Sequence, residues 1–414
     1  MKKIFLFLFM LSAGFSYAAA KDVTITVSNK SAIDRTNEIV EMPMKNVAAK
    51  MKISETASII VLNAEGQQIP YQITYDGKLI FPVNVKAKSS AGYTIKTGTP
   101  EKFAIKACGK HYPERVDDIA WENDRIAFRT YGPALQASGE RAFGYDVWVK
   151  SVPDLVVEKR YDGELNPETR ALIKKVEAIS PKAAKELSNA VSYHIDHGNG
   201  MDCYSVGPTL GAGASALMVD GKIIYPYCYK TFKILDNGPL RFTVEMVYNP
   251  LTIKGNNNVI ETRILSLDAG TQLNKTIIKY ENLKETTPIV TGLVIHEPEG
   301  VARIETNVEK GYITYADPTD NKNNNNGTIF VGAIVPKGVK DAKSIFFNET
   351  ERKNERGGAN GEVITVSDYT PGSEYTYYWG AGWSKFGFDS FADWNTYINN
   401  MAVKIKEPLK VSIK

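Results

Sequence analysis

Short runs in which apolar and polar residues alternate recur along the chain from residue 21 to its end. Successive side chains of a β-strand point to opposite faces, so this period-two pattern predicts strands with one buried face. Residues that favour turns separate the runs. The pattern therefore predicts a mainly β protein. Clear examples are KDVTITVSN (21–29), KLIFPVNVKA (78–87), RIAFRTYG (125–132), LRFTVEMVY (240–248), GTIFVGAIV (327–335) and LKVSIK (409–414).

Helix signals are confined to two regions. In residues 166–194, Asn166 and Ser180 each precede a proline, and a polar cap followed by proline is typical of a helix N-terminus. We expect two short consecutive helices there. In residues 389–401, Ser390 precedes apolar residues at helical spacing, which predicts one more helix with a core-facing stripe.

The length of the chain favours more than one unit. At 414 residues it is longer than most single domains, although large all-β folds form bigger units than other classes. The turn-rich segment GTPEK (98–102) follows a first group of short strands. We therefore expect a small N-terminal β-sandwich over residues 21–100 and a large antiparallel sandwich over residues 101–414, with few helices in either.

The first 20 residues carry a different signal. Lys2 and Lys3 precede an apolar run that extends from residue 4 to about residue 13, and small residues follow it. This order is typical of a secretory signal peptide, which is removed on export. The run is shorter than the roughly 20 apolar residues that a membrane span needs, and no later stretch approaches that length. We predict a signal peptide over residues 1–20, a periplasmic mature protein and no membrane span.

Charge and cysteine content exclude some classes of protein. Lys and Arg total 50 against 47 for Asp and Glu, which is not the basic excess that binding to nucleic acid phosphates requires. We therefore expect no nucleic-acid partner. Cys108, Cys203 and Cys228 allow at most one intramolecular disulfide. The alternative is three buried thiols that act as small apolar side chains.

The stretch SYHIDHGNGMDCYSVG (192–207) holds two of the four histidines of the chain. In an extended segment His194 and Asp196 share a face and His197 takes the other, while glycines let Asp202 fold back toward either. In one interpretation a histidine is a general acid or base that Asp196 or Asp202 orients. In a second, the histidines and aspartates hold a divalent cation. In a third, they are turn residues bonded to neighbouring backbone. The sequence leaves all three open.

Two other segments offer polar candidates. Arg125 and Arg129 are four residues apart, so on a strand they share a face, and guanidinium groups suit the carboxylates of uronic acids. The alternative is a ladder of surface charges. His296 and Glu297 follow the apolar run VTGLVI, and loops at strand ends carry many functional sites. They are therefore a further candidate acid/base pair.

The segment YYWGAGWSKFGF (377–388) is rich in aromatic residues interrupted by glycine. Flat aromatic faces can stack on sugar rings, so Trp379 and Trp383 are candidates for a sugar-binding platform. Aromatic residues are more often buried in the core, and that interpretation also stands.

Several of these segments resemble a known family. They are HIDHGNGMDCYSVGPTLGAGASAL (194–217), WENDRIAFRTYGP (121–133), LSLDAGTQLNKTIIKY (265–280) and VTGLVIHEPEG (290–300). They are similar to secreted bacterial proteins classed as a domain of unknown function, which tend to be encoded among polysaccharide-degrading enzymes. The LDAG, NKT and YEN elements also resemble aldose-epimerase-like proteins. The resemblance covers nearly the whole mature chain.

This resemblance implies a large antiparallel β-supersandwich of the galactose-mutarotase-like kind and a carbohydrate ligand. It does not supply a reaction, because one fold hosts many functions. Mutarotases use a histidine acid and a glutamate base. Here the histidine would be His194, His197 or His296, and the glutamate would be Glu245 or Glu297. Tyr204, within the most specific part of the resemblance, is a candidate substrate contact.

We therefore expect a periplasmic, carbohydrate-active protein that processes a uronate-containing oligosaccharide or polysaccharide by histidine-based acid/base chemistry. The reaction would be of the lyase, hydrolase or epimerase type. No cofactor is expected, although a divalent cation stays open. The alternative function is a noncatalytic glycan-binding protein of a polysaccharide-utilisation system, which would need aromatic contacts but not the histidines.

Overall fold

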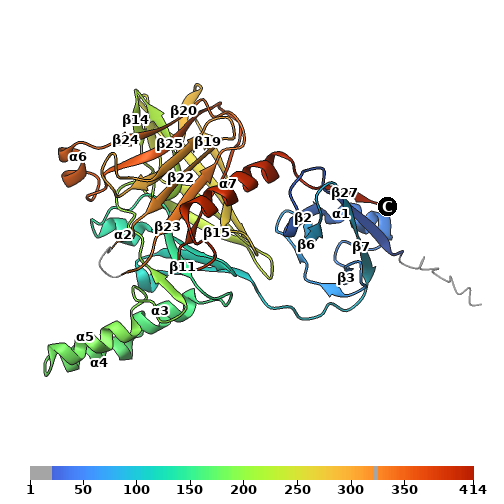
Figure 1. The fold of residues 1–414 in the computed structure, drawn as a ribbon, viewed down its shortest axis with the longest axis horizontal. Helices are drawn as coiled ribbons and strands as arrows, with labels where there is room; N and C mark the ends of the chain where they lie inside the picture. Colours follow the sequence, from blue (N-terminus) through green and yellow to red (C-terminus); the bar gives the residue numbers. More distant parts are fainter. Residues whose placement is uncertain (1–20, 321–324) are drawn as a thin grey trace, which may run out of the picture.

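The computed structural model describes residues 21–320 and 325–414, so the predicted signal peptide over residues 1–20 lies outside the described residues. Figure 1 shows a large body made mostly of strands and a smaller one beside it. All strand pairs in the five sheets are antiparallel apart from isolated bridges, and helices are few. The prediction of a mainly β fold is confirmed.

Two sheets form the smaller body, in the orders β27-β1-β7-β3-β4 and β2-β6-β5. Their inward faces share one apolar core, which includes Ile25, Phe81 and Ile95, and helix α1 (Met44–Met51) adds Val47 to it. The strands are β1 (Val23–Ser28), β2 (Arg35–Pro43), β3 (Ile59–Leu62), β4 (Gln68–Ile69), β5 (Gln72–Ile73), β6 (Lys78–Val85), β7 (Ser90–Thr97) and β27 (Lys410–Ile413).

The end of the chain returns to this smaller body. Strand β27 pairs antiparallel with β1, and Ile413 lies opposite Ile25. Next to this pairing the buried Arg35 donates a hydrogen bond of 2.7 Å from Nη2 to the carbonyl of Glu407. The sheet at the N-terminus therefore contains a strand from the opposite end of the sequence, which a division at residue 100 does not provide.

The larger body is a sandwich of one wide sheet against two narrower ones. The wide sheet has nine strands, in the order β15-β16-β18-β19-β26-β23-β22-β21 with β17 paired to β18. The five-stranded sheets β12-β11-β10-β9-β8 and β14-β13-β20-β25-β24 cover it, with contacts of β11, β13 and β20 on the wide sheet. The long alternating runs of the sequence thus form the two facing layers.

The strands of the larger body have the following bounds. They are β8 (Ala107–Tyr112), β9 (Asp118–Asn123), β10 (Ala127–Thr130), β11 (Asp146–Lys150), β12 (Gly200–Asp202), β13 (Ala212–Val219), β14 (Lys222–Ile224), β15 (Tyr229–Asn237), β16 (Arg241–Tyr248), β17 (Leu251–Ile253), β18 (Asn256–Asp268), β19 (Leu273–Glu281), β20 (Thr287–Ile295), β21 (Ile304–Asn307), β22 (Tyr312–Asp317), β23 (Ile329–Ile334), β24 (Asp341–Phe346), β25 (Gly361–Tyr369) and β26 (Tyr375–Trp383).

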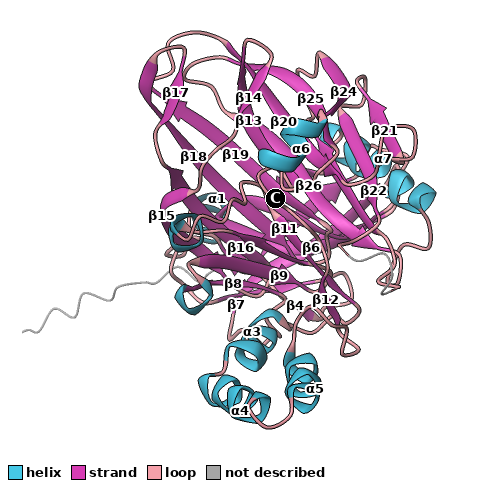
Figure 2. Ribbon diagram, turned by 90° about the vertical axis from the view of Figure 1, so that its left-hand side faces the viewer, coloured by secondary structure: helices cyan, strands magenta, loops and turns pink. Residues whose placement is uncertain are grey.

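Helices lie outside the sheets. In Figures 1 and 2, α3 (Val157–Leu165), α4 (Pro167–Glu177) and α5 (Pro181–Val191) project from one end of the larger body. The Asn166 side chain accepts from Thr169 N, and the Ser180 side chain accepts from Ala183 N. The two predicted caps are therefore confirmed, and so is the helix that Ser390 begins, α7 (Phe391–Lys406).

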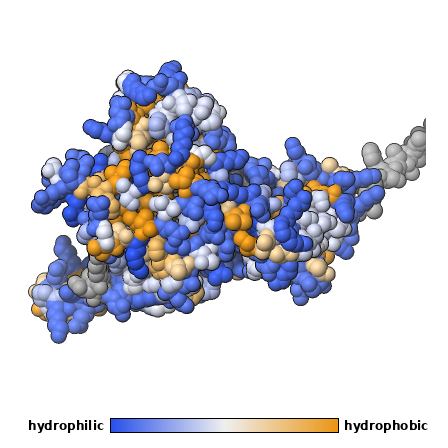
Figure 3. Space-filling model, turned by 45° about the horizontal axis from the view of Figure 1, so that its top comes forward, coloured by the Kyte–Doolittle hydropathy of each residue, from blue (hydrophilic) through white to orange (hydrophobic). Residues whose placement is uncertain are grey.

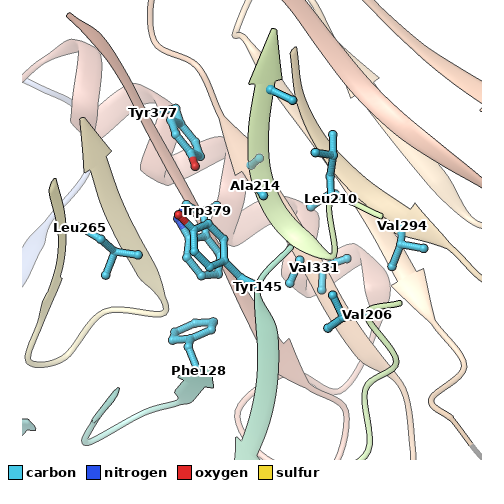
Figure 4. Close-up of a cluster of buried hydrophobic side chains, with 14 of the residues drawn as sticks. Phe128, Tyr145, Val206, Leu210, Ala214, Leu265, Val294, Val331, Tyr377 and Trp379 are labelled. Atoms are coloured by element: carbon cyan, nitrogen blue, oxygen red, sulfur yellow. The ribbon is translucent and has the colours of Figure 1, made fainter. Parts of the chain in front are cut away.

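Trp379 lies at the centre of the large core. Its ring stacks on Tyr145 with centroids 4.1 Å apart and meets Phe128 edge-on, as Figure 4 shows. It is 0% exposed, and its indole N–H donates to Thr276 Oγ1. Trp383 is 2% exposed and donates to the carbonyl of Asn326. The prediction of a sugar-binding platform at these two tryptophans is wrong, because neither ring offers a face to a ligand.

The glycines of the GPTLGAG run make the close contacts of this core possible. Gly211 has φ +57, and a Cβ there would lie 2.4 Å from the carbonyl oxygen of Tyr145. A Cβ on Gly213 would lie 2.5 Å from Trp379 Cβ. The bridge between Tyr145 and Gly211 connects the two five-stranded sheets. Only glycine allows the backbone of one sheet to approach the other this closely.

Other features of the fold concern the thiols and the membrane. Cys108, Cys203 and Cys228 are free, and Cys203 and Cys228 are buried. Among the residues with described positions, no helix is both long and apolar enough to span a membrane. Hydrophilic residues cover most of the face in Figure 3, with hydrophobic patches over the larger body.

Replacing Trp379 tests its place in the core. Trp379→Ala removes a fully buried ring, so the free energy of unfolding should fall by about 3–5 kcal/mol. Urea unfolding followed by circular dichroism measures the change. Tyr75→Ala, which removes a ring that is 50% exposed, serves as the control and should change stability by no more than about 0.5 kcal/mol. Equal losses in both variants would contradict the core assignment.

Candidate functional site

The HIDH segment forms a turn between α5 and β12. Asp196 Oδ1 accepts hydrogen bonds of 2.9 Å from the backbone N–H groups of Gly198 and Gly200. The exposed His197 makes a 3.0 Å contact from Nε2 to the carbonyl of Ser192. Asp196 therefore shapes the turn, as the third interpretation of this stretch expected, and the side chain of His197 bonds to nearby backbone.

Behind this turn lies a buried ion cluster centred on Arg129, a residue of β10 that is 4% exposed. Arg129 Nε donates to Asp146 Oδ2, and Nη2 donates to Asp202 Oδ2, both at 2.8 Å. Asp118 Oδ2 lies 3.7 Å from Nη1. At the surface, His194 Nδ1 lies 3.6 Å from Asp202 Oδ2. The structure thus brings together two of the predicted polar residues, Asp202 and His194, with Arg129.

Arg125 is not part of this cluster. It is exposed and lies in the turn between β9 and β10, where its backbone N–H donates to Asn123 Oδ1. The predicted pairing of Arg125 and Arg129 on one strand face is wrong, because Arg125 precedes β10. Arg129 is unsuited to clamp a substrate because it is buried and its Nε and Nη2 already donate to the protein's own carboxylates.

Three carboxyl groups share one guanidinium in this cluster, so charge neutrality favours a protonated carboxyl. Burial and the neighbouring Asp146 carboxylate together raise the pKa of Asp202 to about 7, against the attraction of Arg129. Burial also raises the pKa of Asp118 to about 6. The cluster therefore binds protons as the pH falls from neutral to acid.

Tyr204 continues the chain two residues beyond Asp202 and reaches a second group of polar residues. Its ring meets the imidazole of His296 edge-on, with ring centroids 5.9 Å apart. The side chain is buried, and in the part of the chain that the structure describes, its hydroxyl has no hydrogen-bond partner. Most buried hydroxyl groups in proteins bond to a protein group or to ordered water, and the Tyr377 hydroxyl is another one without a partner among the described residues.

His296 and Asp317 are a hydrogen-bonded pair in this second group. His296 follows β20, and Asp317 is the last residue of β22. His296 Nδ1 lies 2.5 Å from Asp317 Oδ2. Asp317 is fully buried and also accepts from the backbone N–H of Thr319, while the His296 side chain is 18% exposed. The Tyr315 hydroxyl accepts from the backbone N–H groups of His296 and Glu297. Asp317, which the sequence analysis did not select, is therefore the carboxylate that orients His296.

An open cleft of about 530 Å³ has Tyr204 among the residues that line it. Its walls come from the end of β10, the loop after α2 (Pro133–Ala137), the segment after β12, and α6 (Glu349–Asn354) with the turn that follows. The side chain of Asn360 donates at 2.7 Å to the carbonyl of His296, which ties this last wall to the strand that carries the histidine. The residues that line the cleft are Tyr131, Gly139, Glu140, Arg141, Ala142, Tyr204, Ser205, Val206, Gly207, Pro208, Lys353, Asn354, Glu355 and Gly357.

Metal binding was one interpretation of the sequence. Over residues 21–320 and 325–414, no three His, Cys, Asp or Glu side chains are grouped so that they could hold a metal ion. His194 and His197 make separate contacts, to Asp202 and to Ser192. The four residues of the proposed ligand set therefore do not share one centre.

Sequence reasoning missed several residues of this site. Asp317 ends the run YITYAD just as His296 follows VTGLVI, so the strand-end signal that selected His296 also applied to Asp317. Arg141 lies in a loop and Lys353 in the last turn of α6, and no local pattern marks either as a site residue. Their common cleft arises from contacts between distant segments.

The ion cluster predicts a pH dependence of stability. The pKa of Asp202 is raised from an ordinary value of 3.8 to about 7 in the folded protein, so the folded state binds the proton more tightly than the unfolded state. The stability that wild type has relative to Asp202→Asn should therefore be largest near pH 4 and decline as the pH rises to about 7. Urea unfolding of both proteins across this range measures the difference. A difference that grows with pH would contradict the assignment.

Comparisons with known proteins place this chain in a family. An alignment with the uncharacterized protein P7 of Formosa agariphila extends over 437 residues, is 26% identical and covers all of both chains. Two structures from Enterococcus faecalis, an alpha-mannosidase and a protein of glycosyl hydrolase family 38, are 8% identical, with TM-scores of 0.42 and 0.46 over 95% of this chain. The chain spans 46% and 47% of their respective lengths. Residues 27–411 match the family described as domain of unknown function DUF4861, and the chain belongs to that family.

Proposed function

We propose that this protein is a periplasmic enzyme that processes a uronate-containing oligosaccharide by acid/base chemistry in the cleft beside Tyr204 and His296. The observation that carries the proposal is the His296–Asp317 pair beside the ring of Tyr204, a residue that lines an open cleft and whose buried hydroxyl has no hydrogen-bond partner among the described residues. The signal peptide expected at residues 1–20 supports export.

His296 suits the role of general base. Since Nδ1 is 2.5 Å from the carboxylate of Asp317, the proton on that nitrogen is held, and the lone pair resides on Nε2. An imidazole oriented in this way by a carboxylate abstracts protons and stabilises the imidazolium that forms. Asp317 has no exposed surface, so its role is to position His296.

Tyr204 suits the role of general acid. Burial raises its pKa well above the ordinary tyrosine value, and nearby carboxylates such as Asp317 raise it further, so the hydroxyl keeps its proton at neutral pH. A neutral hydroxyl without an internal acceptor can donate to an oxygen of the substrate. Tyr204 also lines the cleft in which the substrate would bind.

These two groups fit an elimination reaction on a uronate. His296 Nε2 would remove the proton from the carbon next to the carboxylate, and the bond from the adjacent carbon to the glycosidic oxygen would break as a carbon–carbon double bond forms. Tyr204 would give its proton to the departing oxygen. Cations would stabilise the charge that develops on the carboxylate, and Arg141 and Lys353 line the cleft.

Other reactions would leave different traces. Hydrolysis adds water and normally uses two carboxyl groups on either side of the bond. Epimerisation leaves the mass unchanged. A noncatalytic glycan-binding protein would use the cleft without the His296–Asp317 pair. The mass of the product and its ultraviolet absorbance separate these alternatives.

Replacing His296 tests the proposal. His296→Asn keeps a hydrogen-bonding side chain but removes the base, so turnover of uronate oligosaccharides should fall at least about 100-fold. The measurement is the absorbance of the unsaturated uronate product, with masses from mass spectrometry. His197→Asn is the matched control, because His197 is exposed in the turn before β12. The turnover of this variant should stay close to that of wild type.

Two results would contradict the proposal. If no uronate oligosaccharide in a broad panel is altered but several bind, the binding function is supported instead. If His197→Asn abolishes turnover and His296→Asn does not, the chemistry belongs to the HIDH turn.

Tyr204→Phe separates catalysis from stability. The hydroxyl makes no hydrogen bond within the described chain, so its removal should leave the melting temperature unchanged or slightly higher. Turnover should nevertheless fall at least about 100-fold, because the general acid is lost. Thermal unfolding and initial rates measured on the same preparation test both halves. A lower melting temperature with normal turnover would make Tyr204 a structural residue.

A further inference from the structure

Arg356 lies beside the cleft and is held in place by contacts with the protein. It lies in the turn after α6, between cleft-lining residues Glu355 and Gly357. The carbon of its guanidinium lies 4.2 Å from the centroid of the Tyr225 ring and 5.6 Å from that of Phe347. The two aromatic contacts restrict the plane of the guanidinium, which reduces the entropy lost on binding a ligand.

The donors of Arg356 are only partly used by the protein. Nη1 donates at 3.2 Å to the carbonyl of Pro208, on the opposite segment of the cleft wall. Nη2 lies 3.9 Å from Glu355 Oε2, beyond hydrogen-bonding distance, and Nε is buried without a partner among the residues that the structure describes. The side-on edge of the guanidinium, formed by Nε and Nη2, therefore lacks an acceptor.

A purely structural role does not account for this arrangement. The nearest fully buried carboxyl is that of Glu362, to which Tyr225 donates at 2.8 Å. Glu362 also accepts at 2.7 Å from the backbone N–H of Leu210, so its two oxygens are already bonded. Arg356 is thus not required to satisfy the acid beneath Tyr225, although its positive charge is placed nearby.

Arg356 differs in this respect from the two cations that line the cleft. Lys353 pairs with Glu349 at 2.5 Å on the surface of α6. Arg141 is exposed in the loop after α2, and no hydrogen bond or ring contact fixes its orientation in the described structure. Arg356 is the cation whose orientation is set before a ligand arrives.

The turn that carries Arg356 is also connected to the proposed reaction centre. Asn360, four residues later, donates from its backbone N–H to the carbonyl of Ile295 and from its side chain to the carbonyl of His296. Across the cleft wall, Pro208 follows Tyr204 by four residues. The turn that carries Arg356 and the segment that it contacts are therefore both connected, within a few residues, to the residues proposed for acid/base chemistry.

We propose that Arg356 binds the carboxylate of a uronate unit through the side-on edge of its guanidinium and thereby sets the specificity of the cleft for acidic sugars. This inference rests on the proposed function, since it concerns the same cleft. A guanidinium fork matches two carboxylate oxygens better than the point charge of a lysine does. Arg356 takes the role that the sequence assigned to Arg125 or Arg129.

Binding measurements on a catalytically inactive background test this inference. In the His296→Asn protein, calorimetry gives the dissociation constants of trimers of galacturonate, glucuronate and mannuronate and of their methyl esters. With Arg356 intact, the acid form should bind at least about tenfold more tightly than the ester. With Arg356→Gln, the two forms should bind equally. Arg356→Lys keeps the charge and should retain part of the preference.

The comparison of acid with ester also distinguishes a loss of specificity from a folding defect. A variant that is partly unfolded binds both forms less, but the ratio of the two constants does not change. Arg303→Gln, which removes an exposed arginine outside the cleft, is the matched control and should keep the wild-type ratio.

The outcomes separate this inference from the function on which it rests. A tenfold preference that survives in Arg356→Gln overturns the role of Arg356 and leaves the acid/base proposal intact. A sulfated neutral oligosaccharide that requires Arg356, when uronates do not, overturns the carboxylate assignment. If no uronate trimer binds and none is turned over by the protein with His296 intact, both proposals fail.

Discussion

The buried ion cluster around Arg129 fixes the position of β12, on which the candidate site depends. It joins β10, β11 and β12 through the carboxylates of Asp146 and Asp202, so the short strand β12 cannot shift relative to its neighbours. Such clusters are costly to desolvate and add little net stability, but they specify one arrangement because any other leaves buried charges unpaired. Tyr204 follows β12 directly and takes its place from this constraint.

A second set of contacts closes the site from the other side. His296 follows β20, Asp317 is the last residue of β22, and Asn360 precedes β25, so the ends of three strands lie in one region. The hydrogen bonds of Asn360 attach the Arg356 turn to the histidine strand. The residues proposed for acid/base chemistry and for anion binding are therefore held by regular sheet structure, although each lies at a strand end or in a loop.

Much of the fold could be predicted from local patterns in the sequence. The alternating runs indicated the strands, and the caps Asn166, Ser180 and Ser390 indicated three of the helices. The same local patterns misjudged the tryptophans, because aromatic residues beside glycine suit both an exposed platform and a tight core. Trp379 lies in the core since glycines of another strand allow the backbone to approach its ring.

The sequence by itself determined the mainly β class, three of the helix starts and His296 as one candidate, because each of these depends on neighbours within a few residues. Only the tertiary structure decided that Asp317 orients His296, that Asp202 is bound to Arg129, and that Arg356 contacts Pro208, which lines the same cleft as Tyr204. A period of two fixes which face of a strand a side chain takes, but the order of strands in a sheet decides which side chain it meets. That order is set by contacts between residues far apart in the chain.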